Sequence, residues 1–226
     1  MPNLVVVAAL CGCGGGGSDS PPATSVASTA SFPLQSGYRS LVLSPQTYNF
    51  AITGSCTGTA AESVGAATTT TMFEGSAALQ SIVTQQLTRS NCTPPIVTTT
   101  ATTYLDPATY LPSGSVTAGS EYVVASTKAA ALPLTVKVGD NAAVVGFNVY
   151  SDSTKSKLIG TRSATFTITA DTATTALLTI ITNDFVGSSL LGTQQTTYRM
   201  SVDGSLFLVS VDVVTNTGAH LLLTRV

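Results

Sequence analysis

Apolar and polar residues alternate along most of this chain from Gly37 onward, and Gly, Asn, Asp and Ser residues interrupt the alternation. A period of two places successive side chains on opposite faces of a β-strand, so each alternating run predicts a strand with one buried face. The interrupting residues are those that favour turns. The runs that predict strands are 48–53, 66–73, 81–88, 96–105, 134–138, 144–150, 162–170, 176–182, 192–202, 205–214 and 221–226.

The stretch from Ala77 to Leu87 also fits a helix, because its apolar residues lie near a period of 3.6, but we interpret it as a strand. In the stretch from Ser205 to Val214, strict alternation gives one fully apolar face and one mixed face, as in a sheet that curves over a core. The apolar face predicted there contains Phe207, Val209, Val211 and Val213, and the mixed face contains Leu206, Leu208, Ser210 and Asp212.

Short connections between successive strands predict antiparallel neighbours. Asp203-Gly204 is the strongest hairpin signal, because a two-residue turn matched to the strand twist needs positive φ at both positions. We therefore expect an all-β fold of antiparallel sheets, either a sandwich or a curved meander resembling a half-barrel. Ala-rich sequence near 128–133 leaves two organisations open: one large sheet structure, or a Thr-rich subdomain at 35–128 followed by a meander subdomain at 129–226.

The amino-acid composition limits the classes of function that the chain can have. Of the 226 residues, 43% are hydrophobic, which is enough for a sizeable core, whereas only 9% are charged. Threonine takes many of the polar positions that charged residues hold in other proteins. Its branched, polar side chain suits the face of a sheet that meets water. The formal net charge of -2 provides no basic surface, so we expect no nucleic-acid partner.

The amino terminus carries the most specific motif. Residues 4–10 (LVVVAAL) are apolar but too few to span a bilayer, which takes about 20 residues in a helix. Their number fits the apolar region of a signal peptide. The following Leu10-Cys11-Gly12-Cys13 resembles the lipobox of bacterial lipoproteins. That resemblance implies a signal peptide at 1–12, cleavage by signal peptidase II before Cys13, and a diacylglycerol anchor on the Cys13 sulfur.

A tether is expected after the anchor. Gly14 to Gly17 and the following Ser-Asp-Ser-Pro-Pro cannot pack into a core, so residues 13–34 are predicted to form a disordered, flexible linker. The same residues disfavour the alternative that the apolar run is a buried strand or helix of the domain. An Asp directly after the lipidated cysteine resembles an inner-membrane retention signal, and this chain has Gly14 at that position. The resemblance therefore implies an outer-membrane location in a cell with two membranes.

The resemblance leaves two cysteines in the mature chain. The implied cleavage would remove Cys11 and the implied lipidation would modify Cys13, which leaves Cys56 and Cys92 as an even pair in an exported protein. Such a pair predicts one structural disulfide. A zinc site or a redox motif is disfavoured, because the two residues are far apart and the chain contains a single histidine, His220.

No residue pattern in the domain indicates catalysis. His220 lies near Ser205, Ser210, Asp203 and Asp212 in sequence, but sequence proximity does not make a triad, and no G-x-S-x-G motif is present. Most aspartates stand beside turn residues, and no calcium-loop or nucleotide motif occurs. We therefore predict no enzyme activity, no cofactor and no metal. Tyr104, Tyr110 and Tyr122 are expected to cap sheet edges rather than form a binding patch.

Two functions remain open from the sequence. The first is a membrane-tethered envelope lipoprotein with a structural or protein-interaction role and an envelope protein as partner. The alternative is a periplasmic carrier that holds an apolar ligand on a curved sheet. A sealed core favours the first, and an open apolar cavity of about 300–1,000 Å³ favours the second.

Overall fold

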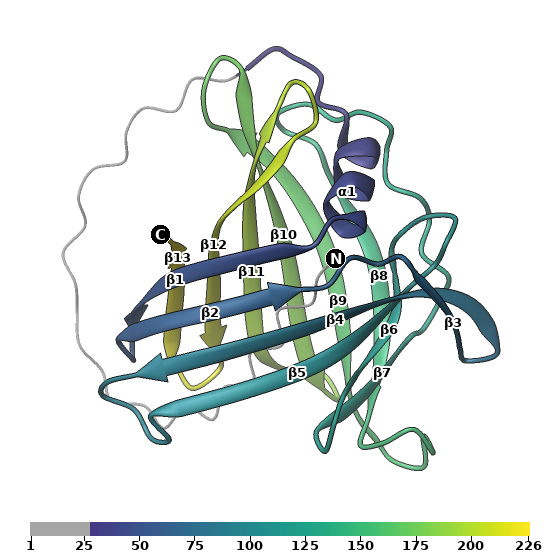
Figure 1. The fold of residues 1–226 in the computed structure, drawn as a ribbon, viewed down its shortest axis with the longest axis vertical. Helices are drawn as coiled ribbons and strands as arrows, with labels where there is room; N and C mark the ends of the chain where they lie inside the picture. The colour runs from purple at the N-terminus through teal and green to yellow at the C-terminus, as the bar shows by residue number, and fades with distance from the viewer. Residues whose placement is uncertain (1–27) are drawn as a thin grey trace.

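The computed structural model describes residues 28–226, and in that part of the chain all strands belong to one antiparallel sheet (Figure 1). Strand β2 pairs with β1 on one side and with β4 on the other, so twelve strands close into a barrel and β3 lies outside it. The elements are α1 (Leu34–Leu43), β1 (Gln46–Gly54), β2 (Gly58–Val64), β3 (Thr69–Phe73), β4 (Ser76–Arg89), β5 (Ile96–Leu105), β6 (Pro112–Thr117), β7 (Glu121–Ala125), β8 (Asn141–Tyr150), β9 (Leu158–Ala170), β10 (Thr175–Val186), β11 (Ser189–Ser201), β12 (Leu206–Thr215) and β13 (His220–Arg225).

The length of β4 makes the closure possible. Its first part pairs with β3, up to Gln80 opposite Thr69, and its second part pairs with β2, from Val83 opposite Val64 to Arg89 opposite Gly58. The prediction of an all-β antiparallel fold is confirmed, and the curved sheet closes fully. A closed barrel leaves no long sheet edge open for pairing with another chain.

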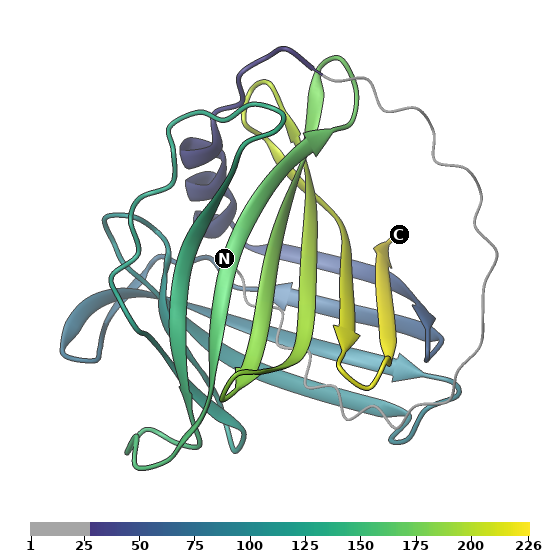
Figure 2. The same cartoon turned by 180° about the vertical axis from the view of Figure 1, so that it is seen from behind.

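The two walls of the barrel cross at a steep angle. Figures 1 and 2 show β1, β2, β4 and β5 running across β8 to β12. The core fills the space between the walls, because inward positions alternate with outward ones along every strand. Large buried side chains come from both walls, namely Tyr48, Phe50, Ile52, Phe166, Ile168, Leu178, Tyr198 and Met200.

Threonine-rich faces lie on the outside, as the composition suggests. Outward hydroxyls bond across neighbouring strands: Thr84 and Thr100 lie 3.3 Å apart on β4 and β5. Thr179 and Thr197 on β10 and β11 lie 3.2 Å apart. Such cross-strand pairs stabilise a sheet whose outer face meets water.

The predicted apolar face of β12 is wrong at Phe207 and Val209 and is confirmed only beyond them, at Val211 and Val213. Leu208 pairs with Tyr198 and Ser210 with Thr197, so Val209 is the extra residue of a β-bulge. A bulge shifts the alternation by one residue. The buried side chains are therefore Leu208, Val211 and Val213, whereas Phe207 is 51% exposed.

Residues 34–43 form a helix, whereas the sequence predicted the end of the tether at residue 34 and alternating strand residues from Gly37 onward. Helix α1 buries Leu34, Tyr38, Leu41 and Val42 at one end of the barrel. These residues recur at helical spacing and cover one face. The tether boundary predicted at residue 34 is also wrong, because Phe32 is fully buried and bridges to Val136.

Further local predictions differ from the structure. Residues 134–138 contribute only that bridge and no strand. The alternation also predicts no strand at β2, β6 or β7. The hairpin at Asp203-Gly204 exists, but its loop includes Val202 and only Gly204 has positive φ, so it is a longer turn closed by Ser201 N–H donating to the Ser205 carbonyl.

The boundary proposed near residues 128–133 falls in the connection between β7 and β8. Those two strands pair with each other, Val123 opposite Val149, and β1 of the first half pairs with β13 of the second. The two halves are thus continuous within one sheet. The stretch from Ala77 to Leu87 lies within β4, so its interpretation as a strand is confirmed.

Candidate functional site

The disulfide predicted from the sequence is present. Cys56, in the β1–β2 loop, is bonded to Cys92, in the β4–β5 loop, with the two Cα atoms 5.8 Å apart. Asn91 supports the same junction, because its side-chain oxygen accepts a 2.8 Å bond from the backbone N–H of Thr57. The bridge ties together two loops at the barrel end opposite α1, which is a structural role. Cys13 lies outside the described residues.

His220 pairs with Asp212 on the neighbouring strand. The ring Nε2 lies 2.8 Å from Asp212 Oδ1, and both side chains are half-exposed. The nearby Ser55 hydroxyl accepts a 3.0 Å bond from the His220 backbone N–H. The histidine therefore has an orienting carboxylate, but this serine bonds the main chain instead of the ring.

The tyrosines form no open patch. Phe73, at the end of β3, stacks on Tyr104 with ring centroids 4.2 Å apart and packs at a tilt against Tyr122, at 5.7 Å. The Tyr122 hydroxyl donates a 2.6 Å bond to Glu74. Tyr110 is separate and lies under the Arg39 guanidinium. These contacts fix the β3–β4 hairpin against the outside of the barrel.

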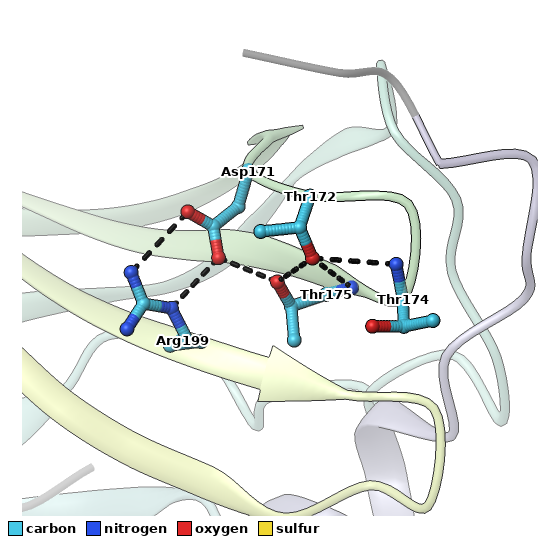
Figure 3. A network of polar contacts seen from close by, with 5 residues as sticks. All are labelled: Asp171, Thr172, Thr174, Thr175 and Arg199. Atoms are coloured by element: carbon cyan, nitrogen blue, oxygen red, sulfur yellow. Dashed lines mark hydrogen bonds and ion pairs between the residues drawn. The ribbon is translucent and has the colours of Figure 1, made fainter. Parts of the chain in front are cut away.

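The polar side chains of one network on the surface form hydrogen bonds with one another. Arg199 on β11 donates two bonds to Asp171, of 2.7 and 3.3 Å, and these lower the pKa of that carboxyl (Figure 3). The Thr175 hydroxyl also bonds Asp171, and Thr172 accepts from the backbone N–H groups of Thr174 and Thr175. Because its members pair with one another, the network stabilises the β9–β10 turn and presents little free hydrogen-bonding capacity.

An open cleft lies between α1 and the β11–β12 turn. Its volume is about 440 Å³, within the size range of ligand sites at barrel mouths. Ser36 and Ser40, one helical turn apart, line the helix side, and Asp203 and Ser205 line the turn side. The Ser205 backbone N–H donates to Asp203 and lowers the pKa of its carboxyl, so this side of the cleft is negatively charged at neutral pH.

The barrel interior contains a buried carboxyl group. Glu62 on β2 is 4% exposed and points inward between Tyr48 on β1 and Gln85 on β4, its partners across the two ladders. Burial raises the pKa of Glu62 to about 8, although the 3.1 Å bond from the Gln85 amide acts in the opposite direction. Glu62 is therefore mostly protonated at neutral pH.

A second interior group is ionised and fully paired. Arg162 on β9 donates two bonds to Glu121 on β7, of 3.3 and 3.2 Å, and a third to Asp184 on β10. The side chains of Arg162 and Glu121 are only 14% and 13% exposed. This triad links three strands at the barrel end opposite α1.

Glu62 and Arg162 were not predicted as buried polar groups, although their positions in the sequence carry a signal. Glu62 lies in phase with Ala60 and Val64 on β2, and Arg162 lies in phase with Ala164 and Phe166 on β9. A charged residue in the inward phase of a strand is informative, because charged groups are seldom buried without a partner. The cleft had no comparable signal, since its two sides are far apart in sequence.

Comparison with protein-family models, curated proteins and solved structures finds no match to this chain. Within residues 28–226, no group of three or more His, Cys, Asp or Glu side chains is arranged to hold a metal ion. In the same range, no helix has both the length and the apolar character needed to cross a membrane.

Proposed function

We propose that this protein is a non-catalytic binding module, anchored to a bacterial envelope membrane through lipid on Cys13. Its partner is an envelope protein that docks a segment into the cleft between α1 and the β11–β12 turn. The observation that carries the binding proposal is the cleft itself, with about 440 Å³ of open space bordered by hydroxyl groups and one carboxylate.

The chemistry of the cleft favours a peptide segment with hydrogen-bond donors. The hydroxyls of Ser36, Ser40 and Ser205 and the Asp203 carboxylate accept hydrogen bonds from backbone N–H groups or from lysine and arginine side chains. Leu41 and Leu206 are the large apolar residues of the lining. Interfaces between proteins commonly combine polar and apolar groups.

The position of the cleft also fits a tethered module. Helix α1 follows directly on the segment that leads back to Cys13, so the cleft lies at the end of the barrel from which the tether extends. The stretch from Cys13 to Ser28 reaches at most about 50 Å when fully extended. A partner in or near the same membrane is within that reach.

The carrier alternative receives less support. The apolar cavity under α1, between Leu41, Val64 and Leu105, has a volume of about 10 Å³. A site for a lipid-like ligand needs about 300 Å³ or more. The large cleft, in contrast, is bordered mainly by polar groups, which suits a peptide better than an apolar ligand.

Membrane fractionation tests the anchor. Cys13→Ser should move the full-length protein from the membrane fraction to the aqueous fraction, whereas Cys92→Ala should remain with the membranes. A Cys13→Ser protein that still sediments with membranes would contradict lipid anchoring. Photo-cross-linking from Ser40 and Ser205 tests the docking site.

A further inference from the structure

Three buried hydroxyl groups on the inner wall of the barrel lack hydrogen-bond partners within the protein. They belong to Thr103 on β5 and to Ser115 and Thr117 on β6, whose residues are 1%, 0% and 5% exposed. The Tyr38 and Tyr48 hydroxyls and Arg89 Nε are also buried without a partner, whereas Ser81 Oγ donates a 2.6 Å bond to the Gly65 carbonyl. The hydroxyls of Thr103, Ser115 and Thr117 share two adjacent strands, β5 and β6.

The register places the three hydroxyls in one row. Thr103 lies directly opposite Ser115, and Thr117 is the next inward residue along β6. On the other side of β6, Thr117 lies opposite Glu121, the carboxylate that binds Arg162. The row thus runs along the inner wall from the end covered by α1 towards the buried ion pair.

The spacing within the row suits bridging groups rather than direct bonds. Directly opposite residues have Cβ atoms about 4.5–5.5 Å apart, and successive inward residues on one strand are about 7 Å apart. A hydroxyl–hydroxyl bond spans only about 2.7–2.8 Å. One intervening hydroxyl group, bonded on both sides, spans about twice that distance, which matches the separation of the opposite pair Thr103 and Ser115.

One end of the row has space for such a group. Thr103 lines a small cavity with Gln46, Ser81 and the α1 residues Leu41 and Val42. Its volume is about 10 Å³, close to the lower limit of about 10–15 Å³ for a buried water molecule. Thr103 and Ser81, which both carry hydroxyl groups, are among the residues that line this cavity.

We propose that the inner wall of β5 and β6 is a binding site for a hydroxyl-bearing guest, a row of ordered water molecules bonded to Thr103, Ser115 and Thr117. A hydroxylated small molecule has the same chemistry and is distinguished by experiment. Buried polar groups are nearly always hydrogen-bonded, and internal water is the usual partner where protein groups are too far apart. This site is separate from the cleft and does not depend on the proposed function.

The sign of a stability change tests the proposal. Thr103→Val, Ser115→Ala and Thr117→Val each remove one hydroxyl with little change of shape. If guests bind these hydroxyls, each substitution removes a hydrogen-bond partner of a buried guest. The melting temperature of the full-length protein then falls by about 3 °C or more. If the hydroxyls are unbonded, removing them relieves an unsatisfied group and raises the melting temperature.

Thr102→Val is the matched control, because Thr102 lies on the same strand with its side chain on the outer face. Its shift measures the general effect of Thr→Val in this sheet. Melting temperatures for the three inner substitutions that equal or exceed the control would overturn the proposal. Native mass spectrometry of the full-length protein then identifies the guest: excess mass that is lost in the Thr103→Val variant indicates an organic molecule, and a bare mass with lowered stability indicates water.

Discussion

The Cα of Gly37 in α1 packs directly against the backbone carbonyl of Gly204 in the β11–β12 turn. A Cβ atom added at Gly37 would lie 2.1 Å from the Gly204 oxygen, far inside any tolerated contact. Gly204 itself has φ +88°, and a Cβ there would meet Pro33 at 2.9 Å. The helix and the turn that form the two sides of the cleft are therefore held together by two glycines.

Gly37→Ala should destabilise the protein, although glycine to alanine within a helix normally stabilises by up to about 1 kcal/mol. The added methyl group would push α1 away from the turn and expose Leu41 and Val42. Urea unfolding measures the change. Ser40→Ala, on the exposed face of the same helix, is the control and should be neutral or slightly stabilising. An unchanged or raised midpoint for Gly37→Ala would show that the helix does not pack on the turn in this way.

Arg162→Leu should lower the free energy of unfolding by about 3 kcal/mol or more, because it leaves the largely buried Glu121 carboxylate without its cation. The Asp184 carboxylate, which is 43% exposed, loses the same partner. Arg199→Leu is the matched control. Arg199 forms a similar pair with Asp171, but its side chain is 48% exposed, so its loss should have an effect of about 1 kcal/mol or less. Equal losses in the two variants would mean that Arg162 is not buried among its partners.

Glu62 should make stability depend on pH. Its pKa is raised from an ordinary value of 4.5 to about 8, so between these pH values the folded protein keeps a proton that the unfolded chain has lost. Stability should therefore fall as the pH rises through this window and level off above it. The side chains that face Glu62 are Tyr48 and Gln85, with Tyr198 from the opposite wall and Arg225 close to Tyr48.

Glu62→Gln tests this dependence, since glutamine is neutral at all these pH values and retains an oxygen for the Gln85 amide. The variant should lose the decline in stability between the two pKa values and be more stable than the native protein at pH 9. Chemical denaturation at several pH values measures both effects. A pH profile identical to that of the native protein would exclude Glu62 as the group responsible.

Loss of the disulfide should weaken the end of the barrel opposite α1. The Cys56–Cys92 bridge encloses a separation of 36 residues, for which loss of unfolded-state entropy predicts about 3–4 kcal/mol of stabilisation. The Cys56→Ala/Cys92→Ala double variant should lose this amount in urea unfolding. Reducing agent should lower the stability of the native protein and leave that of the double variant unchanged. Native protein that is insensitive to reductant would contradict a stabilising role.

The sequence predicts the strands and their antiparallel arrangement because alternation is a local signal. Barrel closure is not local: it depends on β2, whose small residues and inward Glu62 hide the alternation, and on its pairing with both β1 and β4. The bulge at Val209 likewise reverses the faces of β12 without an obvious change in the sequence pattern.

Helix α1 could have been recognised from its apolar spacing, but Gly37 and an N-terminal Pro33 without a side-chain cap obscure it. The cleft could not have been predicted. Ser40 and Ser205 come together only because α1 packs against a turn from the other end of the chain, and serine and aspartate in such segments are ordinarily explained by turn formation.

The most direct test of the binding proposal is photo-cross-linking in cells from single positions of the full-length protein. A photoreactive residue at Ser40 or at Ser205 should give the same cross-linked partner protein, because both positions border one cleft. A photoreactive residue at Thr217, in the exposed β12–β13 turn at the opposite end of the barrel, should not give it. Cross-links that are equally strong from all three positions, or that arise only at Thr217, would contradict a docking site between α1 and the β11–β12 turn.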